Sequence, residues 1–241
     1  MFFSTILVAA AVVVPALATA VPSLNVPACP AKGTVTYNKS VPDKGPYPLT
    51  QVDLCYDATA IHITFTAHNE TNFFVNPNYT TNDAIYEYTA METFISRGTN
   101  DPQTYLEFEI APNNVTFQAF IYNPSKVRSA SCVQCGSADV SQVRADGAPF
   151  DTFYVAEPLV DGMTAVTTVD KPKGLWVSSA RIPLGLFNVD AGLAKGTQWR
   201  MNFFRIITAP ATFPAQFYGA WNQPSAANFH MTPFFGNVQF V

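Results

Sequence analysis

Short runs in which apolar and polar residues alternate are the feature of this sequence that most constrains its fold. Successive side chains of a β-strand point to opposite faces of the sheet, so a period of two predicts strands with one wet face. Residues 51–57 and 60–68 show the pattern most clearly, and the short turn between them predicts a hairpin. Comparable runs, each bounded by Gly, Pro or Asn, lie at residues 91–96, 104–110, 115–122, 163–169, 174–182, 197–207 and 236–241.

These nine runs predict an all-β fold, an antiparallel two-sheet β-sandwich that is jelly-roll-like and has minor helix. One helical turn is expected at residues 183–187, which read Pro-Leu-Gly-Leu-Phe. Residues 123–162 are rich in Ser, Gly and Asp and are expected to form a long loop. The sequence has no internal repeat, and its length suits one large β domain.

The N-terminus has the pattern of a cleavable secretory signal. Residues 1–20 are apolar, carry no charged side chain, and end in small residues at Ala18 and Ala20. We expect cleavage after Ala20 and therefore a secreted, extracellular protein. The alternative, an uncleaved signal anchor, is disfavoured by Pro15 and by the lack of flanking Lys or Arg. No later run is long and apolar enough to predict a membrane span.

Prolines punctuate residues 21–50, at Pro22, Pro27, Pro30, Pro42, Pro46 and Pro48. Because proline fixes the backbone and has no N–H group to donate, such a stretch favours extended or turn structure. We therefore expect residues 21–50 to form a leader that enters the domain without building its core. Residues 51–241 are expected to form the domain itself.

The cysteines are even in number, and secretion places them where disulfides persist. They are Cys29, Cys55, Cys132 and Cys135, which allow three pairings. We expect Cys29–Cys55, which would pin the N-terminal segment, and Cys132–Cys135, which would close a short surface loop. The second pair could instead be a redox or metal motif, but a single Cys-x-x-Cys is a weak signal for either.

The sequence also indicates a glycoprotein that does not bind nucleic acid. Asn-x-Ser/Thr sequons occur at Asn38, Asn69, Asn78 and Asn114. The formal net charge is −4, with no Lys or Arg cluster, which argues against nucleic acid as a partner. We expect a monomer.

Two carboxylates are predicted to share one face of the strand at residues 104–110. Tyr105, Glu107 and Glu109 alternate with apolar residues that face the other way, which places the two acids about 7 Å apart. Their repulsion could be offset by a cation, by Arg205 or by the hydroxyl groups of a ligand. A solvated outer face is the other interpretation that the pattern allows.

Other candidate site residues are an acid, an amide, an arginine and a tryptophan. Glu92 shares its face with an aromatic residue and could contact a ligand or pair with Arg205. Trp199 is expected in the core, whereas Arg205 or Asn202 of the same strand could reach a site. Trp221 lies in a predicted loop and could form a stacking platform for a ligand, although core packing is the alternative. Trp176 is expected to pack in the core or between the sheets.

Four motifs give the chain a resemblance to a known family. Residues 92–95 read Glu-Thr-Phe-Ile, 105–109 read Tyr-Leu-Glu-Phe-Glu, and 199–205 read Trp-Arg-Met-Asn-Phe-Phe-Arg. The fourth, the closing segment, contains Ala-Trp at 220–221, Phe-His at 229–230 and Phe-Gly at 235–236. Over roughly residues 50–241 this order resembles the family 9 carbohydrate-binding modules and their fungal secreted relatives. The resemblance implies a β-sandwich that binds sugars, often with structural calcium, and implies no catalysis.

We predict that the protein is secreted and binds a plant or fungal cell-wall polysaccharide or oligosaccharide without catalysis. In this role it could assist other enzymes in carbohydrate catabolism. In this interpretation Trp221 stacks on the sugar, and the polar contacts come from Glu92, Glu109, Asn202 and Arg205. Some family members hold the sugar between two Trp side chains. The first of that pair has no clear match here, and Tyr86 or Tyr88 could take its place.

Three other function classes are alternatives to carbohydrate binding. A glycosidase is disfavoured because Glu107 and Glu109 would approach a substrate from the same side, and no Gly-x-Ser-x-Gly, His-Glu-x-x-His or phosphate-loop motif occurs. A structural or cell-wall interaction role remains open. So does a haem-binding electron-transfer β-sandwich, for which the axial ligands would be drawn from His68, His230, Met91, Met163 and Met201.

Overall fold

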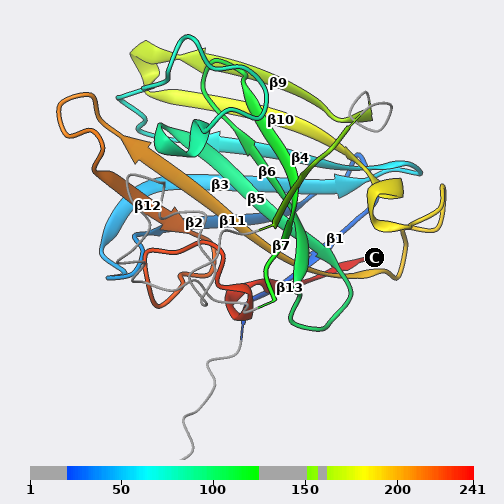
Figure 1. Ribbon diagram of the computed structural model, residues 1–241. Helices are drawn as coiled ribbons and strands as arrows, with labels where there is room; N and C mark the ends of the chain where they lie inside the picture. Colours follow the sequence, from blue (N-terminus) through cyan, green and yellow to red (C-terminus); the bar gives the residue numbers. More distant parts are fainter. Residues whose placement is uncertain (1–20, 125–150, 157–161) are drawn as a thin grey trace, which may run out of the picture.

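The structure is a computed structural model that describes residues 21–124, 151–156 and 162–241. Two β-sheets face each other in it (Figure 1). The larger sheet has the strand order β1-β13-β11-β5-β6-β7-β8, with β12 also paired to β11. Its strands are β1 (Ser23–Val26), β5 (Ala90–Arg97), β6 (Thr104–Ile110), β7 (Thr116–Tyr122), β8 (Asp151–Tyr154), β11 (Gln198–Thr208), β12 (Gln216–Ala220) and β13 (Gly236–Phe240).

The smaller sheet has the order β2-β3-β4-β10-β9. Its strands are β2 (Gly33–Lys39), β3 (Pro46–Tyr56), β4 (Ala60–Ala67), β9 (Thr164–Asp170) and β10 (Leu175–Pro183). All strand pairs are antiparallel except β1 with β13. The predicted antiparallel β-sandwich is therefore confirmed, and so is the hairpin, which β3 and β4 form.

Helix is limited to short 3-10 turns in the described residues. One of them, η5 (Leu184–Phe187), lies where a single helical turn was predicted. None of the helices in the part of the chain that the structure describes is long and apolar enough to cross a membrane. The predicted long loop at 123–162 falls mostly outside the described residues, but four of its residues form the edge strand β8.

The core between the sheets is built by the inward side of the alternating strands. β4 contributes Ile61, Ile63 and Phe65, and β6 contributes Leu106 and Phe108, all of which are almost fully buried. Trp176 and Trp199 lie in the same core, as expected. Fully burying one such side chain contributes roughly 1.5–3 kcal/mol, so these rows hold the two sheets together.

The expectation that residues 21–50 stay outside the core is wrong. They form β1, β2 and the beginning of β3, and Val26, Val35 and Tyr37 are part of the inner core. The prolines allow this because Pro22 and Pro27 flank β1 and so leave its backbone donors intact. The strand pattern of these residues was masked by the prolines around β1 and β2 and by Pro46 and Pro48 at the start of β3.

The disulfide Cys29–Cys55 is confirmed, with its two Cα atoms 5.1 Å apart. It ties the segment before β2 to the end of β3. Cys132 and Cys135 lie outside the described residues, as does the predicted signal at 1–20. All four sequon asparagines, Asn38, Asn69, Asn78 and Asn114, are exposed, which is what glycan attachment requires.

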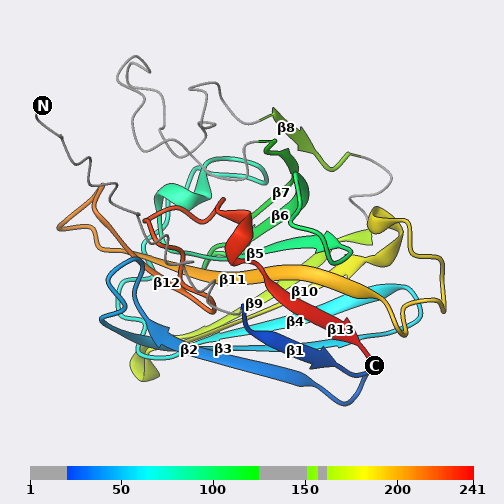
Figure 2. The same cartoon turned by 90° about the horizontal axis from the view of Figure 1, so that it is seen from below.

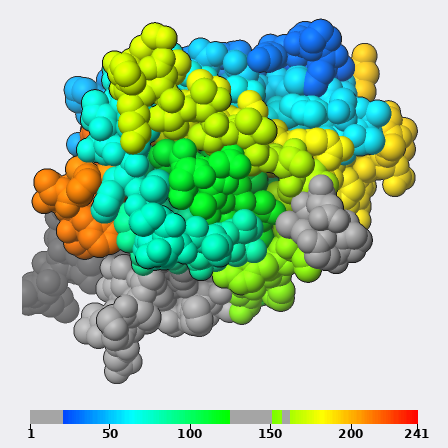
Figure 3. Space-filling model, turned by 90° about the horizontal axis from the view of Figure 1, so that it is seen from above, coloured from blue at the N-terminus to red at the C-terminus, as the bar shows by residue number. Residues whose placement is uncertain are grey.

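The outer face of the larger sheet is covered at one end and open at the other. At the covered end, a second apolar cluster includes Phe94, Phe117 and Phe204 from the sheet with Phe229 and Phe235 from the closing segment. Figure 3 shows the neighbouring surface, where the turn between β6 and β7, in green, lies between β9 and the segment 70–89. At the open end, β1, β13 and β11 lie side by side (Figure 2).

Candidate functional site

Three carboxylates meet on the covered outer face of the larger sheet. Glu92 of β5 lies directly opposite Glu109 of β6, and Glu107 lies two residues before Glu109 on the same face. One carboxylate oxygen from each lies within 4.8 Å of the others. Their exposed fractions are 2 % for Glu92, 2 % for Glu107 and 0 % for Glu109, so the interpretation of a solvated outer face is wrong.

Burial sets the electrostatics of this carboxylate cluster, by which we mean Glu92, Glu107 and Glu109. Burial first, and then the negative charge of Glu107, raises the pKa of the Glu92 carboxyl well above its usual range. Within the described residues, Oε1 of Glu92 is buried and makes no hydrogen bond. Carboxylates this close repel one another, so the cluster favours uptake of a proton or of a cation.

His230 lies beside the carboxylate cluster, a position that the sequence analysis did not predict. Its Nδ1 is 2.8 Å from the hydroxyl oxygen of Tyr105, and its Nε2 is 3.7 Å from Oε1 of Glu107. Nδ2 of Asn123 donates to the backbone carbonyl of His230 at 3.0 Å, and the backbone N–H of His230 donates to Oδ1 of Asn228. The Phe-His pair at residues 229–230 of the closing segment is the motif that could have indicated this position of His230.

Two tyrosines stand beside the cluster with part of their rings exposed. Phe117 of β7 lies opposite Glu109, and two aromatic rings meet it edge to face. Tyr86 of η1 (Ile85–Glu87) has its ring centroid 6.1 Å from that of Phe117, and Tyr154 of β8 has its centroid 5.7 Å away. Tyr154 is 54 % exposed, so it can offer aromatic surface to a ligand.

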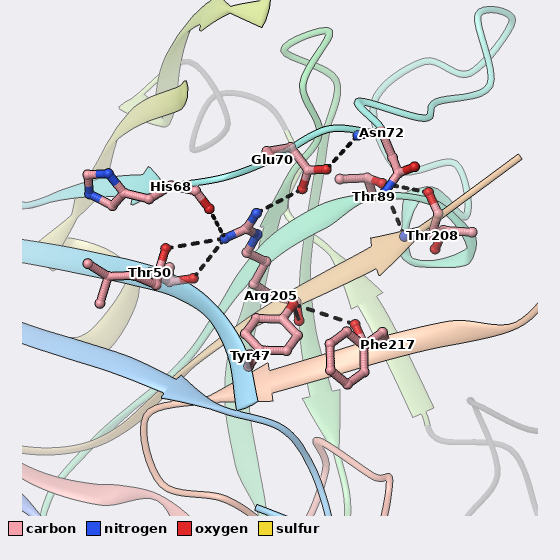
Figure 4. A network of polar contacts seen from close by, with 10 residues as sticks. Tyr47, Thr50, His68, Glu70, Asn72, Thr89, Arg205, Thr208 and Phe217 are labelled. Atoms are coloured by element: carbon pink, nitrogen blue, oxygen red, sulfur yellow. Dashed lines mark hydrogen bonds and ion pairs between the residues drawn. The ribbon is translucent and has the colours of Figure 1, made fainter. Parts of the chain in front are cut away.

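Arg205 does not reach the carboxylate cluster. It lies on the inner face of β11, is fully buried, and donates from Nη2 to Oε2 of Glu70 at 3.0 Å (Figure 4). Its Nη1 donates to the hydroxyl of Thr50 at 3.2 Å and to the backbone carbonyls of Leu49 and His68, each at 3.3 Å. Arg205 therefore joins the larger sheet to the smaller one.

Asn202 is on the outer face but is used to hold the closing segment. Its Nδ2 donates to the carbonyls of Asn222 at 2.9 Å and Phe234 at 3.3 Å, and its Oδ1 accepts from the backbone N–H of Asn222 at 3.1 Å. With its side chain fully buried, these contacts give it a structural role.

Trp221 packs toward the inner core. Its ring centroid is 5.6 Å from that of Phe203, and it covers Gly236 so closely that a Cβ there would lie 2.4 Å from the indole ring. Trp221 is half-buried at the edge of the inner core, which agrees with the alternative of core packing. The five predicted ligand residues do not form one site, because Trp221 and Arg205 lie on the inner side and Glu92, Glu109 and Asn202 on the outer side.

The structure also separates several of the residues considered as haem ligands. Met91 and Met201 lie in the core between the sheets. His230 packs against Phe94 and Tyr105 on the opposite face of the larger sheet. The sheet itself stands between them, so neither methionine can share a metal with His230 in this fold.

Comparison with known proteins gives one related sequence and several similar folds. No family model matches the chain. A protein of Arthroderma benhamiae described as "Extracellular protein" is 45 % identical over 220 residues, which cover 91 % of each chain. A proposed carbohydrate-binding protein from Bacteroides uniformis has a similar fold, with a TM-score of 0.63 and 14 % identity over 92 % of this chain and all of its own.

A family 9 carbohydrate-binding module from Caldicellulosiruptor kristjanssonii, solved with cellotriose, is also similar, with a TM-score of 0.53 and 11 % identity. The match covers 90 % of this chain and 93 % of the module. At these identities the two structures establish that the β-sandwich is of the kind found in carbohydrate-binding proteins.

Proposed function

This chain belongs to the same family as the extracellular protein of Arthroderma benhamiae, and from that premise we propose that it is a secreted, non-catalytic carbohydrate-binding domain. The family and the Cys29–Cys55 disulfide support secretion. The β-sandwich shared with carbohydrate-binding proteins supports the ligand class. The specific ligand that we propose is a cell-wall polysaccharide or an oligosaccharide derived from one.

The observation that carries the proposal is the group of Tyr86, Phe117 and Tyr154 beside the carboxylate cluster. Sugar sites combine an aromatic surface, which contacts the C–H groups of the ring, with a few fixed polar groups. Tyr154 and Tyr86 provide that surface, and Phe117 holds both rings in place. Since Glu92 and Glu109 are buried, we assign them a positioning role beneath the aromatic side chains in place of direct sugar contact.

Calorimetric titration with cello- and xylo-oligosaccharides tests this site. We expect saturable binding to the wild type and a loss of about 2- to 10-fold in affinity for Tyr154→Ala, as removal of one aromatic contact predicts. Phe217→Ala is the matched control because Phe217 is also an exposed aromatic residue but packs against Tyr47 on β3. Equal losses in both variants would refute the assignment to Tyr154. Absence of binding by a folded wild type would favour an interaction protein of the cell wall.

Calcium, which the family resemblance implies, would find suitable donors in the carboxylate cluster. Calcium prefers carboxylate and other oxygen ligands, and three carboxylates converge here. Oε1 of Glu92, which makes no hydrogen bond in the described part of the chain, fits the same interpretation. Bound at Glu92, Glu107 and Glu109, the ion would offset most of their negative charge and stabilise the covered end of the larger sheet.

A further inference from the structure

The open end of the larger sheet's outer face contains a groove remote from the carboxylate cluster. It encloses about 400 Å³ and is lined by β1, β11 and β13 together with Thr99 of the turn after β5. Cavities of this size are typical of small-molecule sites. We call it the amide groove, because four of its lining residues carry a side-chain carboxamide: Asn25, Gln198, Asn237 and Gln239.

The sheet register arranges these carboxamides in order. Asn25 of β1 pairs with Gln239 of β13, and Gln239 pairs with Gln198 of β11, so three carboxamides form one row across three strands. Neighbouring strands lie about 4.8 Å apart, so the row spans about 10 Å. Asn237 stands in the next row, opposite Ser23. All four carboxamides are exposed and point to the same outer face.

The four carboxamides of the amide groove have no evident structural role. None of the four carboxamides makes a side-chain hydrogen bond with any described residue. Asn is also depleted in β-strands, yet Asn25 and Asn237 occupy strand positions. Residues that break a local preference without a compensating contact are commonly retained for function.

The chemistry of the lining indicates what the amide groove would bind. A carboxamide both donates and accepts hydrogen bonds, which matches a hydroxyl group that does the same. No charged side chain lines the groove, although the chain as a whole has a net charge of −4. A ligand rich in hydroxyls and free of charge fits both features, because a charged ligand would find no oppositely charged side chain among the lining residues.

We propose that the amide groove is a second glycan-binding site, specific for an uncharged oligosaccharide chain. This inference rests on the proposed carbohydrate-binding function but places a separate contact at the β1–β13–β11 end of the sheet. A chain bound there would exchange hydrogen bonds with the row of Asn25, Gln239 and Gln198. The two sites would let one long polysaccharide, or two chains of a wall, be held on one face of the protein.

The test follows the side-chain NH₂ signals of the secreted, full mature protein by NMR as uncharged cellohexaose or xylohexaose is added. We expect the signals of Asn25, Gln198, Asn237 and Gln239 to shift in a saturable way. A polygalacturonate oligomer, which carries many negative charges, should leave them in place. Unmoved amide signals while the sugar binds elsewhere would overturn the inference and leave the proposed function standing.

A double variant provides the second measurement. Gln198→Ala combined with Gln239→Ala is expected to weaken hexaose binding at the amide groove about 10-fold or more, since two hydrogen-bonding side chains are lost. Thr36→Ala combined with Thr168→Ala, on the exposed face of the smaller sheet, is the control and should leave affinity unchanged. Equal affinity in all three proteins would contradict the proposal.

Discussion

Arg205 and Glu70 form an ion pair that water does not reach, since both side chains are 0 % exposed. Breaking such a pair by removing one partner leaves an uncompensated buried charge and typically costs about 3–5 kcal/mol. We therefore expect Arg205→Met to lower the free energy of unfolding by that amount in urea titrations. The double variant Arg205→Met with Glu70→Gln should recover part of the loss, and a single-variant loss below about 1 kcal/mol would contradict the structural role.

At the same scale, the carboxylate cluster predicts a calcium effect on stability. A ligand that binds only the folded state stabilises it by an amount that grows with the logarithm of the ratio of ligand concentration to dissociation constant, and so raises the unfolding temperature. Thermal unfolding of the wild type should therefore shift upward in calcium relative to EDTA. Glu92→Gln should lose most of this shift because it removes one charged donor. Identical melting curves with calcium and with EDTA would exclude the cluster as a calcium site.

In the β3–β4 hairpin, the side chain of Asp57 stabilises the turn that joins the two strands. Asp57 accepts hydrogen bonds from the backbone N–H groups of Thr59 and Ala60 and from Nε2 of His62 at 2.7 Å. Burial acts to raise the pKa of Asp57, but these hydrogen bonds outweigh it and lower that pKa below its usual value. A carboxyl whose folded pKa is lowered stabilises the fold above its unfolded pKa of about 4, and the gain disappears as pH falls through the folded value.

We accordingly expect Asp57→Asn to cost about 0.5–1 kcal/mol at pH 7, a modest figure because the side chain is 43 % exposed and screened by water. The difference from wild type should shrink as the pH is lowered through the acid range. Urea denaturation at neutral and acid pH measures it, with the exposed Asp190→Asn as control. A loss that stays the same at both pH values would point to a packing effect of the substitution instead.

Strand alternation also shows which elements the sequence can predict and which it cannot. The period of two placed Glu107 and Glu109 on one face, and the structure confirms that arrangement. It could not give the register that sets Glu92 opposite Glu109, or the burial of all three, because the covering residues come from distant segments such as the closing segment at 221–235. β1 and β2 were missed because the prolines around them resemble those of a linker.

At the scale of the whole molecule, the family resemblance predicted the right fold. The five ligand residues that it suggested, however, lie on two different faces of the larger sheet. The motif residues Asn202, Arg205 and Trp221 hold the closing segment and the two sheets in place. The surfaces that we propose to meet a ligand are the tyrosines beside the carboxylate cluster and the amide groove. The sequence indicated only Tyr86 among these residues, since Tyr154 and Gln239 gain their roles through strand pairing.

The central claim is that this secreted β-sandwich binds carbohydrate, and co-sedimentation with insoluble polysaccharide tests it most directly. The mature protein is mixed with cellulose, insoluble xylan or fungal wall glucan, and the protein left in solution is measured against concentration. The account predicts saturable depletion by at least one of these polymers and release by its soluble oligosaccharide. Protein that is folded yet remains in solution with every polymer would contradict it.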